Sequence, residues 1–326
     1  MRTCKRVEYL DALRGFAILL VIVGHLIQSN YQDALSDPLF NIIYSFHMPL
    51  FFFLSGCARY IVEKESFLMV SFTSVLKDVI KKFTALIIPS VIWSVVVPHF
   101  FTSGVIWTLD ALSSYWFLNV LFAIMVLWDI MTLFAKWLRS NIAVITIVAI
   151  GIVVCLIVNI YRIPLVYLIL FLLGYIWQRY SYSEKISSAV ILILAVFFLL
   201  LVGKYQYGSN SIGDPNRVWL LLPLSIAASI VLHWMFSKNK INYRALTILG
   251  RYSLGIYLCH FFFVDIPILA RVQEQLHGLT EYFVLLAVAV VISYACVVIQ
   301  YIVGQINWLN GFLYGNWKFL RNEGGR

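Results

Sequence analysis

Long runs of apolar residues, separated by short polar segments, recur from one end of the chain to the other. A typical run covers residues 141–160 and is close to the roughly 20 residues that a helix needs to cross a ~30 Å hydrocarbon core. The runs lack the alternation of apolar and polar positions that marks the ~10-residue strands of a membrane barrel. The pattern therefore predicts an all-α bundle of about ten transmembrane helices. They are expected at about residues 8–28, 40–60, 82–100, 115–135, 141–160, 163–180, 187–204, 217–236, 250–270 and 281–303.

The composition agrees with a membrane protein. Of the 326 residues, 62% are hydrophobic and 12% are charged, whereas a soluble domain carries roughly 25% charged residues. The first apolar segment is too long for a signal peptide and contains charged residues, so we expect it to be a helix of the protein. The five cysteines show no paired spacing, which predicts neither a disulfide framework nor a metal site. Because the polar loops are short, we expect a single transmembrane domain over residues 1–326.

The basic residues are distributed unevenly along the chain. Nineteen of the 24 lysines and arginines lie in the two tails and in every second loop, four lie in the remaining loops, and Arg14 lies within the first helix. Cytoplasmic loops of membrane proteins carry such an excess of positive charge. The distribution predicts that both termini are cytoplasmic. It also explains the net charge of +9 by contact with the lipid bilayer, without a nucleic-acid partner.

The first predicted helix carries three ionisable residues, Asp11, Arg14 and His25, where burial in the bilayer costs at least ~2.5–3.5 kcal/mol each. Arg14 and His25 are eleven residues apart, which places them on one face and about 16 Å apart along the axis. Asp11 lies one turn before Arg14 and can pair with it; it is also a candidate substrate contact. The stripe fits a functional site. A structural salt bridge with a hydrogen-bonded histidine is the alternative.

Other polar residues lie in the apolar segments. His47 and Asn119 fit either substrate contacts or contacts between helices, and Pro49 is expected to open the second helix locally. Tyr257 and His260, in the ninth segment, are further candidates for the substrate site. Each has packing as its alternative role.

A basic cluster precedes the third predicted helix. Its members include Lys81 and Lys82, which suit the phosphates of a ligand or the head groups of anionic lipids. The excess of positive charge common to cytoplasmic loops explains them equally well. The sequence contains no glycine-rich phosphate loop, no HExxH motif and no nucleophile elbow.

Four segments, in order along nearly the whole chain, resemble the membrane-bound acyltransferase-3 family, and especially its fucose 4-O-acetylase-like branch. They are YLDALRGFAILLVIVGH (Tyr9–His25), FHMPLFFFLSG (Phe46–Gly56), YWFLNVLF (Tyr115–Phe122) and GRYSLGIYLCH (Gly250–His260). The most specific element is an arginine followed after ten residues by a histidine in the first helix.

The resemblance implies transfer of an acyl group, commonly acetyl from acetyl-CoA, to a hydroxyl of a surface carbohydrate. Arg14 and His25 match the family's functional pair, with His25 as the catalytic residue. The family often has two arginines three residues apart before the third-helix proline, where this chain has Lys82 and Ala85 before Pro89. With Lys82 and Ala85 in place of the two arginines, we expect Lys82 to contact the donor and Lys81 or Lys77 to compensate for the missing arginine.

The scheme that follows places the phosphates of CoA near Arg14, Lys81 and Lys82, with the pantetheine arm extending toward His25. His25 then acts as a general base or carries the acetyl group itself. The resemblance implies a bacterial inner membrane protein with no permanently bound cofactor. Its acceptor would be a surface polysaccharide or a lipid-linked sugar precursor.

Two other functions fit the same residues. A transporter or flippase for a lipid-linked sugar or a small anion would also use buried polar groups in ten helices, although the internal repeat common in transporters is not evident here. An acyltransferase that uses another donor, such as succinyl-CoA, is the second alternative.

Overall fold

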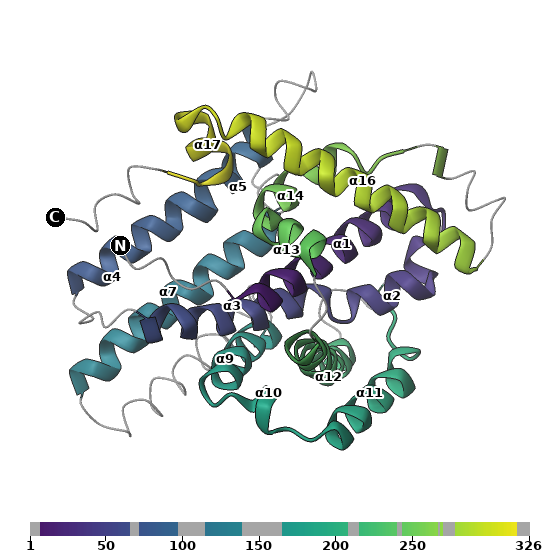
Figure 1. Cartoon of the computed structure of the whole chain (residues 1–326), viewed down its shortest axis with the longest axis horizontal. Helices are drawn as coiled ribbons and strands as arrows, with labels where there is room; N and C mark the ends of the chain where they lie inside the picture. The colour runs from purple at the N-terminus through teal and green to yellow at the C-terminus, as the bar shows by residue number, and fades with distance from the viewer. Residues whose placement is uncertain are drawn as a thin grey trace. The chain divides into compact units, whose positions relative to one another are not determined.

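The helices expected from the sequence dominate the computed structural model, which describes residues 7–65, 72–96, 115–138, 165–207, 215–239, 243–266, 268–269 and 278–317. Every regular element in these ranges is helical, and none is a strand (Figure 1). The chain divides into two units. We call Cys4–Val62 with Ile169–Ile299 the histidine unit, and Met1–Thr3, Glu63–Leu168 and Gln300–Arg326 the lysine unit.

The histidine unit is built around its first helix, α1. Its elements are α1 (Glu8–Asn30), η1 (Ala34–Ser36), α2 (Pro38–Tyr44), α3 (His47–Glu65), α9 (Leu165–Arg179), α10 (Tyr182–Lys185), α11 (Ser188–Val202), α12 (Pro215–Lys238), α13 (Arg244–Arg251), α14 (Ser253–Cys259), η5 (His260–Phe262) and α16 (Leu279–Val303). Helices α3, α9 and α16 each continue into the lysine unit. More than half of α1 is buried, because α2, α12, α13 and α14 all contact it. This burial makes α1 a fixed support for its polar side chains.

Helices α1 and α13 approach each other closely enough for their backbones to touch (Figure 1). A Cβ added to Gly15 would lie 1.9 Å from the carbonyl oxygen of Leu246, and one added to Gly250 would lie 1.7 Å from that of Asp11. Only glycine leaves room for this approach, as at the small-residue contacts of membrane helices. The contact brings the C-terminal end of α13 beside the first turns of α1.

The lysine unit contains a long helical stretch that includes two π-helical segments. It runs through α4 (Phe72–Lys82), the π-helix η2 (Phe83–Ile87), α5 (Ile88–Val91) and the π-helix η3 (Ile92–Val96), and the unit also holds α7 (Trp116–Leu138) and α17 (Asn307–Tyr314). The indole Nε1 of Trp317 donates to the Thr84 carbonyl at 3.3 Å. That of Trp93 donates to the Leu313 carbonyl at 2.7 Å. These bonds fasten the C-terminal segment to the π-helical stretch.

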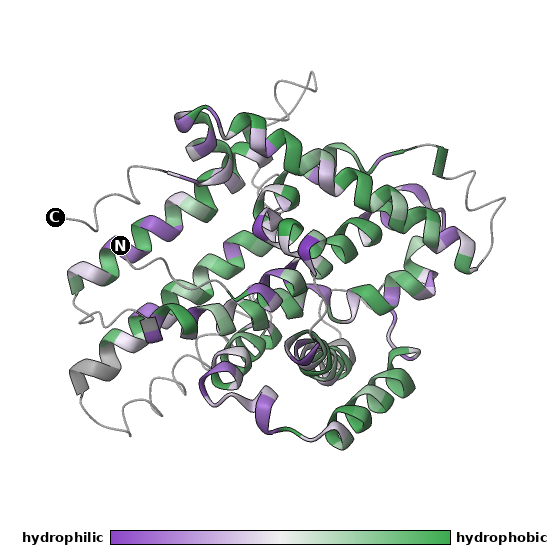
Figure 2. Cartoon of the chain, in the orientation of Figure 1, coloured by the Kyte–Doolittle hydropathy of each residue, from purple (hydrophilic) through white to green (hydrophobic). Residues whose placement is uncertain are grey.

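Five helical stretches in the described ranges are long and apolar enough to cross a membrane. They are Glu8–Asn30, Pro38–Lys64, Trp116–Leu133, Trp219–Lys238 and Leu279–Val303. Leu165–Arg179, Ser188–Val202 and Ser253–Phe262 are shorter apolar helices. Figure 2 shows hydrophobic residues along most of α11 and α16. The chain is thus a multi-pass helical membrane protein. The total of ten helices and the cytoplasmic termini stay predictions, and the expected helix at 141–160 lies outside the described residues.

Three boundaries differ from the prediction. The helix expected to begin at residue 82 begins at Phe72, so the lysine cluster belongs to a helix and not to a loop. The segment expected as one helix over 250–270 is divided at Tyr252 and leaves helical conformation after Phe262. The second helix opens between Tyr44 and His47, before Pro49. Pro49 lies in the first turn of α3, where its missing N–H removes no helical hydrogen bond.

Candidate functional site

A charged cluster lies in the first turns of α1. The Arg14 Nη1 donates to the Asp11 Oδ1 at 3.2 Å, as the spacing of three residues predicts. The Arg251 Nε, at the end of α13, lies 3.8 Å from the other carboxylate oxygen. Asp11 is buried, whereas the Arg14 side chain keeps 27% of its surface exposed. The two guanidinium groups bring positive charge to this end of the helix.

His25 lies just over three turns beyond Arg14 on α1 and is half-buried. Its Nδ1 is 3.2 Å from the amide oxygen of Gln28, which also accepts the hydroxyl hydrogen of Tyr44 at 2.8 Å. Because an amide oxygen accepts, this contact favours the tautomer in which Nδ1 carries the hydrogen. The lone pair of neutral His25 is then on Nε2, the nitrogen available to take a proton or to attack a carbonyl carbon.

Two further histidines belong to the surroundings of His25. The ring of His260 lies 5.2 Å from that of His25, and the ring of His47 lies 4.7 Å from that of Tyr44. His260 and His47 are buried, and each places Nδ1 near a backbone carbonyl, at 3.0 Å from Ile256 and 2.8 Å from Ile43. Within the described ranges, the His260 Nε2 makes no hydrogen bond. The arrangement places polar nitrogen atoms around His25 in otherwise apolar surroundings.

Aromatic rings complete these surroundings. The Phe261 ring lies 4.7 Å from His25 and 4.4 Å from His260. The ring of Tyr257 is 5.9 Å from His260. These contacts hold the imidazole of His25 between α1 and the segment that follows α14. An imidazole enclosed in this way keeps one orientation, which general-base or nucleophilic catalysis requires.

The lysine unit holds the remaining candidates. The Lys82 ammonium pairs with the buried carboxylate of Asp129 on α7. The hydroxyl of Ser90 donates to the amide oxygen of Asn119 at 3.4 Å. Lys81 is exposed. Since Lys82 already faces a carboxylate, Lys81 is the better placed of the two to meet an anion.

The structure thus brings together four of the predicted site residues within the histidine unit: His25, His47, Tyr257 and His260. Asp11 and Arg14 form the second group on the same helix, and Lys81, Lys82 and Asn119 belong to the lysine unit.

Sequence reasoning missed Gln28, Tyr44, Phe261 and the pairing of Arg251. The helical spacing of three residues after His25 was a signal for Gln28. The others depend on contacts between segments far apart in the chain. Nowhere in the described ranges do three histidine, cysteine or carboxylate side chains lie close enough to hold a metal ion.

Comparison with known proteins adds a family. Residues 7–298 match a family described as "Acyltransferase domain". A nodulation protein NolL of Sinorhizobium fredii is 29% identical over 153 residues, which cover 41% of this chain and 40% of that protein. A nodulation protein NolL of Mesorhizobium japonicum is 28% identical over 288 residues, covering 76% of this chain and 74% of the relative. No solved structure matches the chain.

Proposed function

We propose that the chain is a membrane O-acetyltransferase, because it belongs to the acyltransferase-domain family. The family model matches residues 7–298 of this 326-residue chain. The enzyme moves an acetyl group from acetyl-CoA to a hydroxyl of a cell-surface carbohydrate or of its lipid-linked precursor. The observation that carries the proposal is the geometry of His25. Its Nδ1 faces the amide oxygen of Gln28, which leaves the lone pair on Nε2, and the rings of Tyr44, His260 and Phe261 lie around it.

His25 activates the acceptor. Its Nε2 takes the proton of the acceptor hydroxyl while the hydroxyl oxygen attacks the thioester carbonyl carbon of acetyl-CoA. A C–O bond forms, the C–S bond breaks, and the CoA sulfur leaves and takes up a proton. In the alternative order, Nε2 attacks the thioester first and an acetyl-imidazole then passes the acetyl group to the hydroxyl. Both orders need the same neutral tautomer, which the Gln28 contact supplies.

Gln28 is a positioning residue in this mechanism. Its amide oxygen accepts from both His25 and Tyr44, so it fixes the ring orientation and the tautomer together. The role resembles that of the carboxylate in a hydrolase triad, which orients a histidine through Nδ1. Gln28 carries no charge, however, so it adds orientation without an electrostatic pull on the imidazole.

The charged cluster of α1 suits the donor. Arg14 keeps part of its surface exposed, and the net positive charge shared with Asp11 and Arg251 attracts a phosphate of CoA. From Arg14 to His25, the helical rise gives about 16 Å, a distance that the extended pantetheine arm can follow along α1. Lys81 is an additional candidate for the donor phosphates. The proposed location is the inner membrane of a bacterium, with the donor supplied from the cytoplasm.

Purified protein in proteoliposomes tests the proposal. Acetyl-CoA and succinyl-CoA, each labelled in the acyl group, are supplied in parallel with a set of candidate glycans, and empty liposomes are the control. We expect label on a glycan from acetyl-CoA, with a product mass that matches one added acetyl group. Transfer from succinyl-CoA but not from acetyl-CoA would show that succinyl-CoA is the acyl donor. Protein that stays folded and labels no glycan from any acyl donor would overturn the proposed function.

A further inference from the structure

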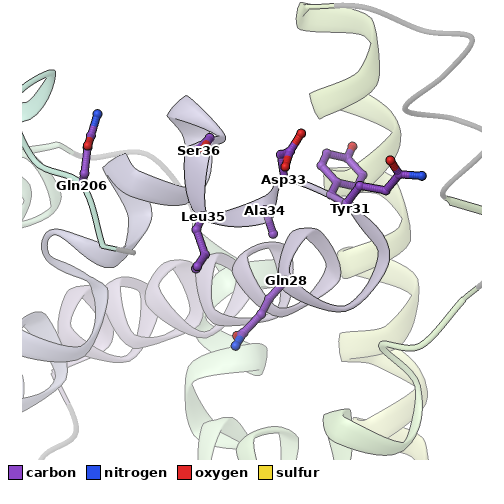
Figure 3. A pocket seen from close by; sticks show the side chains of 8 residues that line it. Gln28, Tyr31, Asp33, Ala34, Leu35, Ser36 and Gln206 are labelled. Atoms are coloured by element: carbon purple, nitrogen blue, oxygen red, sulfur yellow. The ribbon is translucent and has the colours of Figure 1, made fainter. Parts of the chain in front are cut away.

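An open pocket of about 590 Å³ lies at the C-terminal end of α1. The end of α1, the turn after it and η1 form most of the wall, and Gln206, from the segment after α11, closes another side (Figure 3). The volume is within the ~300–1,000 Å³ that is usual for small-molecule sites. All of its wall belongs to the histidine unit.

The side chains of the pocket suit a sugar ring. Gln28, Gln32 and Gln206 offer amide groups, and Asp33 and Ser36 offer further polar atoms. A sugar needs such pairs of donors and acceptors for its hydroxyl groups. The remaining wall is apolar or aromatic, from Tyr31, Ala34 and Leu35, and can cover the C–H face of the ring.

The charge of the pocket indicates which sugars fit. Among the described residues that line the pocket, none is lysine or arginine, whereas Asp33 brings a carboxylate. The carboxylates of Glu281 and Asp37 also lie close to Tyr31. Burial is the main cause that raises the pKa of the Tyr31 hydroxyl, and these two carboxylates raise it further. That hydroxyl remains protonated and lies beside Glu281 without reaching hydrogen-bond geometry. An anionic sugar would meet negative charge with no cation in the lining to offset it.

The pocket is directly connected to the catalytic imidazole. Gln28 lines the pocket and accepts the Nδ1–H of His25 at 3.2 Å. His25 and Gln28 are three positions apart, so the rise between them along α1 is about 4.5 Å. The pocket therefore adjoins the part of α1 that carries His25, and the acceptor hydroxyl has to extend past Gln28 to meet the Nε2 of the imidazole.

Hydrogen bonds hold the two sides of the pocket in place. The amide of Asn41 donates to the Leu35 carbonyl at 2.9 Å and accepts from the Tyr207 backbone N–H at 2.7 Å. The Tyr205 hydroxyl donates to the Tyr44 carbonyl at 3.4 Å. Both neighbours of Gln206 are thereby tied to the α1–α2 region. A wall fixed before the ligand arrives reduces the entropy lost on binding.

We propose that this pocket binds the sugar ring whose hydroxyl is acetylated, and that it selects uncharged sugars over carboxylated ones. The proposal rests on the proposed function and adds the location and the charge class of the acceptor. Asp33 is the main source of the charge selectivity. Gln206 and Gln28 supply hydrogen bonds to the ring.

Binding and transfer are measured separately to test the proposal. The full chain in detergent is titrated with neutral methyl glycosides and with the matching uronic acid glycosides, and the acceptor KM is measured with acetyl-CoA. We expect the wild type to bind the best neutral glycoside about tenfold more tightly than its carboxylated counterpart. Gln206→Ala should weaken neutral binding about tenfold and raise the acceptor KM to match, as expected for the loss of one hydrogen bond. The KM for acetyl-CoA should stay unchanged.

Two variants complete the test. Asp33→Asn keeps the shape of the side chain and should narrow the difference between neutral and carboxylated glycosides. Ser29→Ala alters an exposed residue of α1 that does not line the pocket and should change nothing. Equal binding of both glycoside classes by the wild type, or an unchanged acceptor KM in Gln206→Ala, would overturn the pocket assignment while leaving the proposed function standing. Sugar binding without transfer from any acyl donor would instead overturn the proposed function.

Discussion

Replacing Gln28 by leucine removes the oxygen that holds both the imidazole of His25 and the hydroxyl of Tyr44. Leucine has a similar length, so the change removes the acceptor and keeps much of the volume. The imidazole then loses the contact that fixes its tautomer and its orientation. We expect kcat to fall, with the protein still folded, because Gln28 is exposed and contributes little to the core.

The size of the effect follows from the two hydrogen bonds. Each neutral hydrogen bond contributes about 0.5–1.5 kcal/mol net, and water can replace part of the bond to Tyr44 at this exposed position. A loss of about 1–2 kcal/mol in the transition state corresponds to about a 5- to 30-fold decrease in kcat. Tyr44→Phe removes only one of the two bonds and should give the smaller decrease.

The assay is kcat for transfer of labelled acetyl at saturating acceptor, since Gln28 also lines the acceptor pocket and its loss would raise the acceptor KM. Gln28→Glu serves as the matched variant, because a carboxylate oxygen can accept both hydrogen bonds. It should keep kcat above that of Gln28→Leu. If the leucine variant kept the wild-type kcat, or if glutamate and leucine lowered it equally, orientation of His25 by Gln28 would be wrong.

Three further changes probe other parts of the structure. Gly250→Ala places a methyl group 1.7 Å from a backbone oxygen and should destabilise the protein by about 3 kcal/mol. Gly203→Ala is the control, because no atom lies within 4 Å of the added methyl group, and it should leave stability unchanged. Both are measured by thermal unfolding followed by size exclusion. Asp129→Asn should destabilise the protein by about 3 kcal/mol, because it removes the carboxylate that pairs with the largely buried ammonium of Lys82. In the same assay, the double variant Asp129→Asn/Lys82→Met should recover part of the lost stability. A double variant as unstable as the sum of the single ones would contradict this pairing. Arg14→Gln should raise the KM for acetyl-CoA about tenfold and leave the acceptor KM unchanged. Arg14→Lys should give a KM for acetyl-CoA between those of the wild type and Arg14→Gln. An unchanged KM for acetyl-CoA in Arg14→Gln would exclude Arg14 from the donor site.

The sequence was sufficient to predict α1 and its charged pair. The apolar run over 8–28 became Glu8–Asn30, and Asp11 pairs with Arg14 as their spacing indicates. Both features are local, since hydropathy and helical periodicity depend only on neighbours in the chain. His25 and His260 were each singled out as ionisable residues in apolar segments, but the contact between their rings could not be predicted from the sequence.

The breaks and long-range contacts could not be read from the pattern. The apolar composition continues through Tyr252 although the helix does not, because the approach of Gly250 to α1 depends on a partner that is more than 200 residues away in the chain. The pairing of Lys82 with Asp129 likewise joins two segments that are 47 positions apart. The early start of α4 was missed because the charged residues of that segment resemble a loop. On the helix, its exposed apolar side chains, among them Leu76 and Ile80, alternate with lysines at helical spacing.

In both proposed orders of the reaction, acyl transfer requires the imidazole of His25, and substitution of this residue is the direct test. Wild type, His25→Ala and His25→Asn are reconstituted in proteoliposomes with labelled acetyl-CoA and an acceptor glycan, and size exclusion confirms that all three are folded. Label is followed on both the glycan and the protein. We expect transfer by the wild type and a loss of at least about 100-fold in both variants, the order of magnitude for a general base. Transfer at the wild-type rate by folded His25→Ala protein would contradict it.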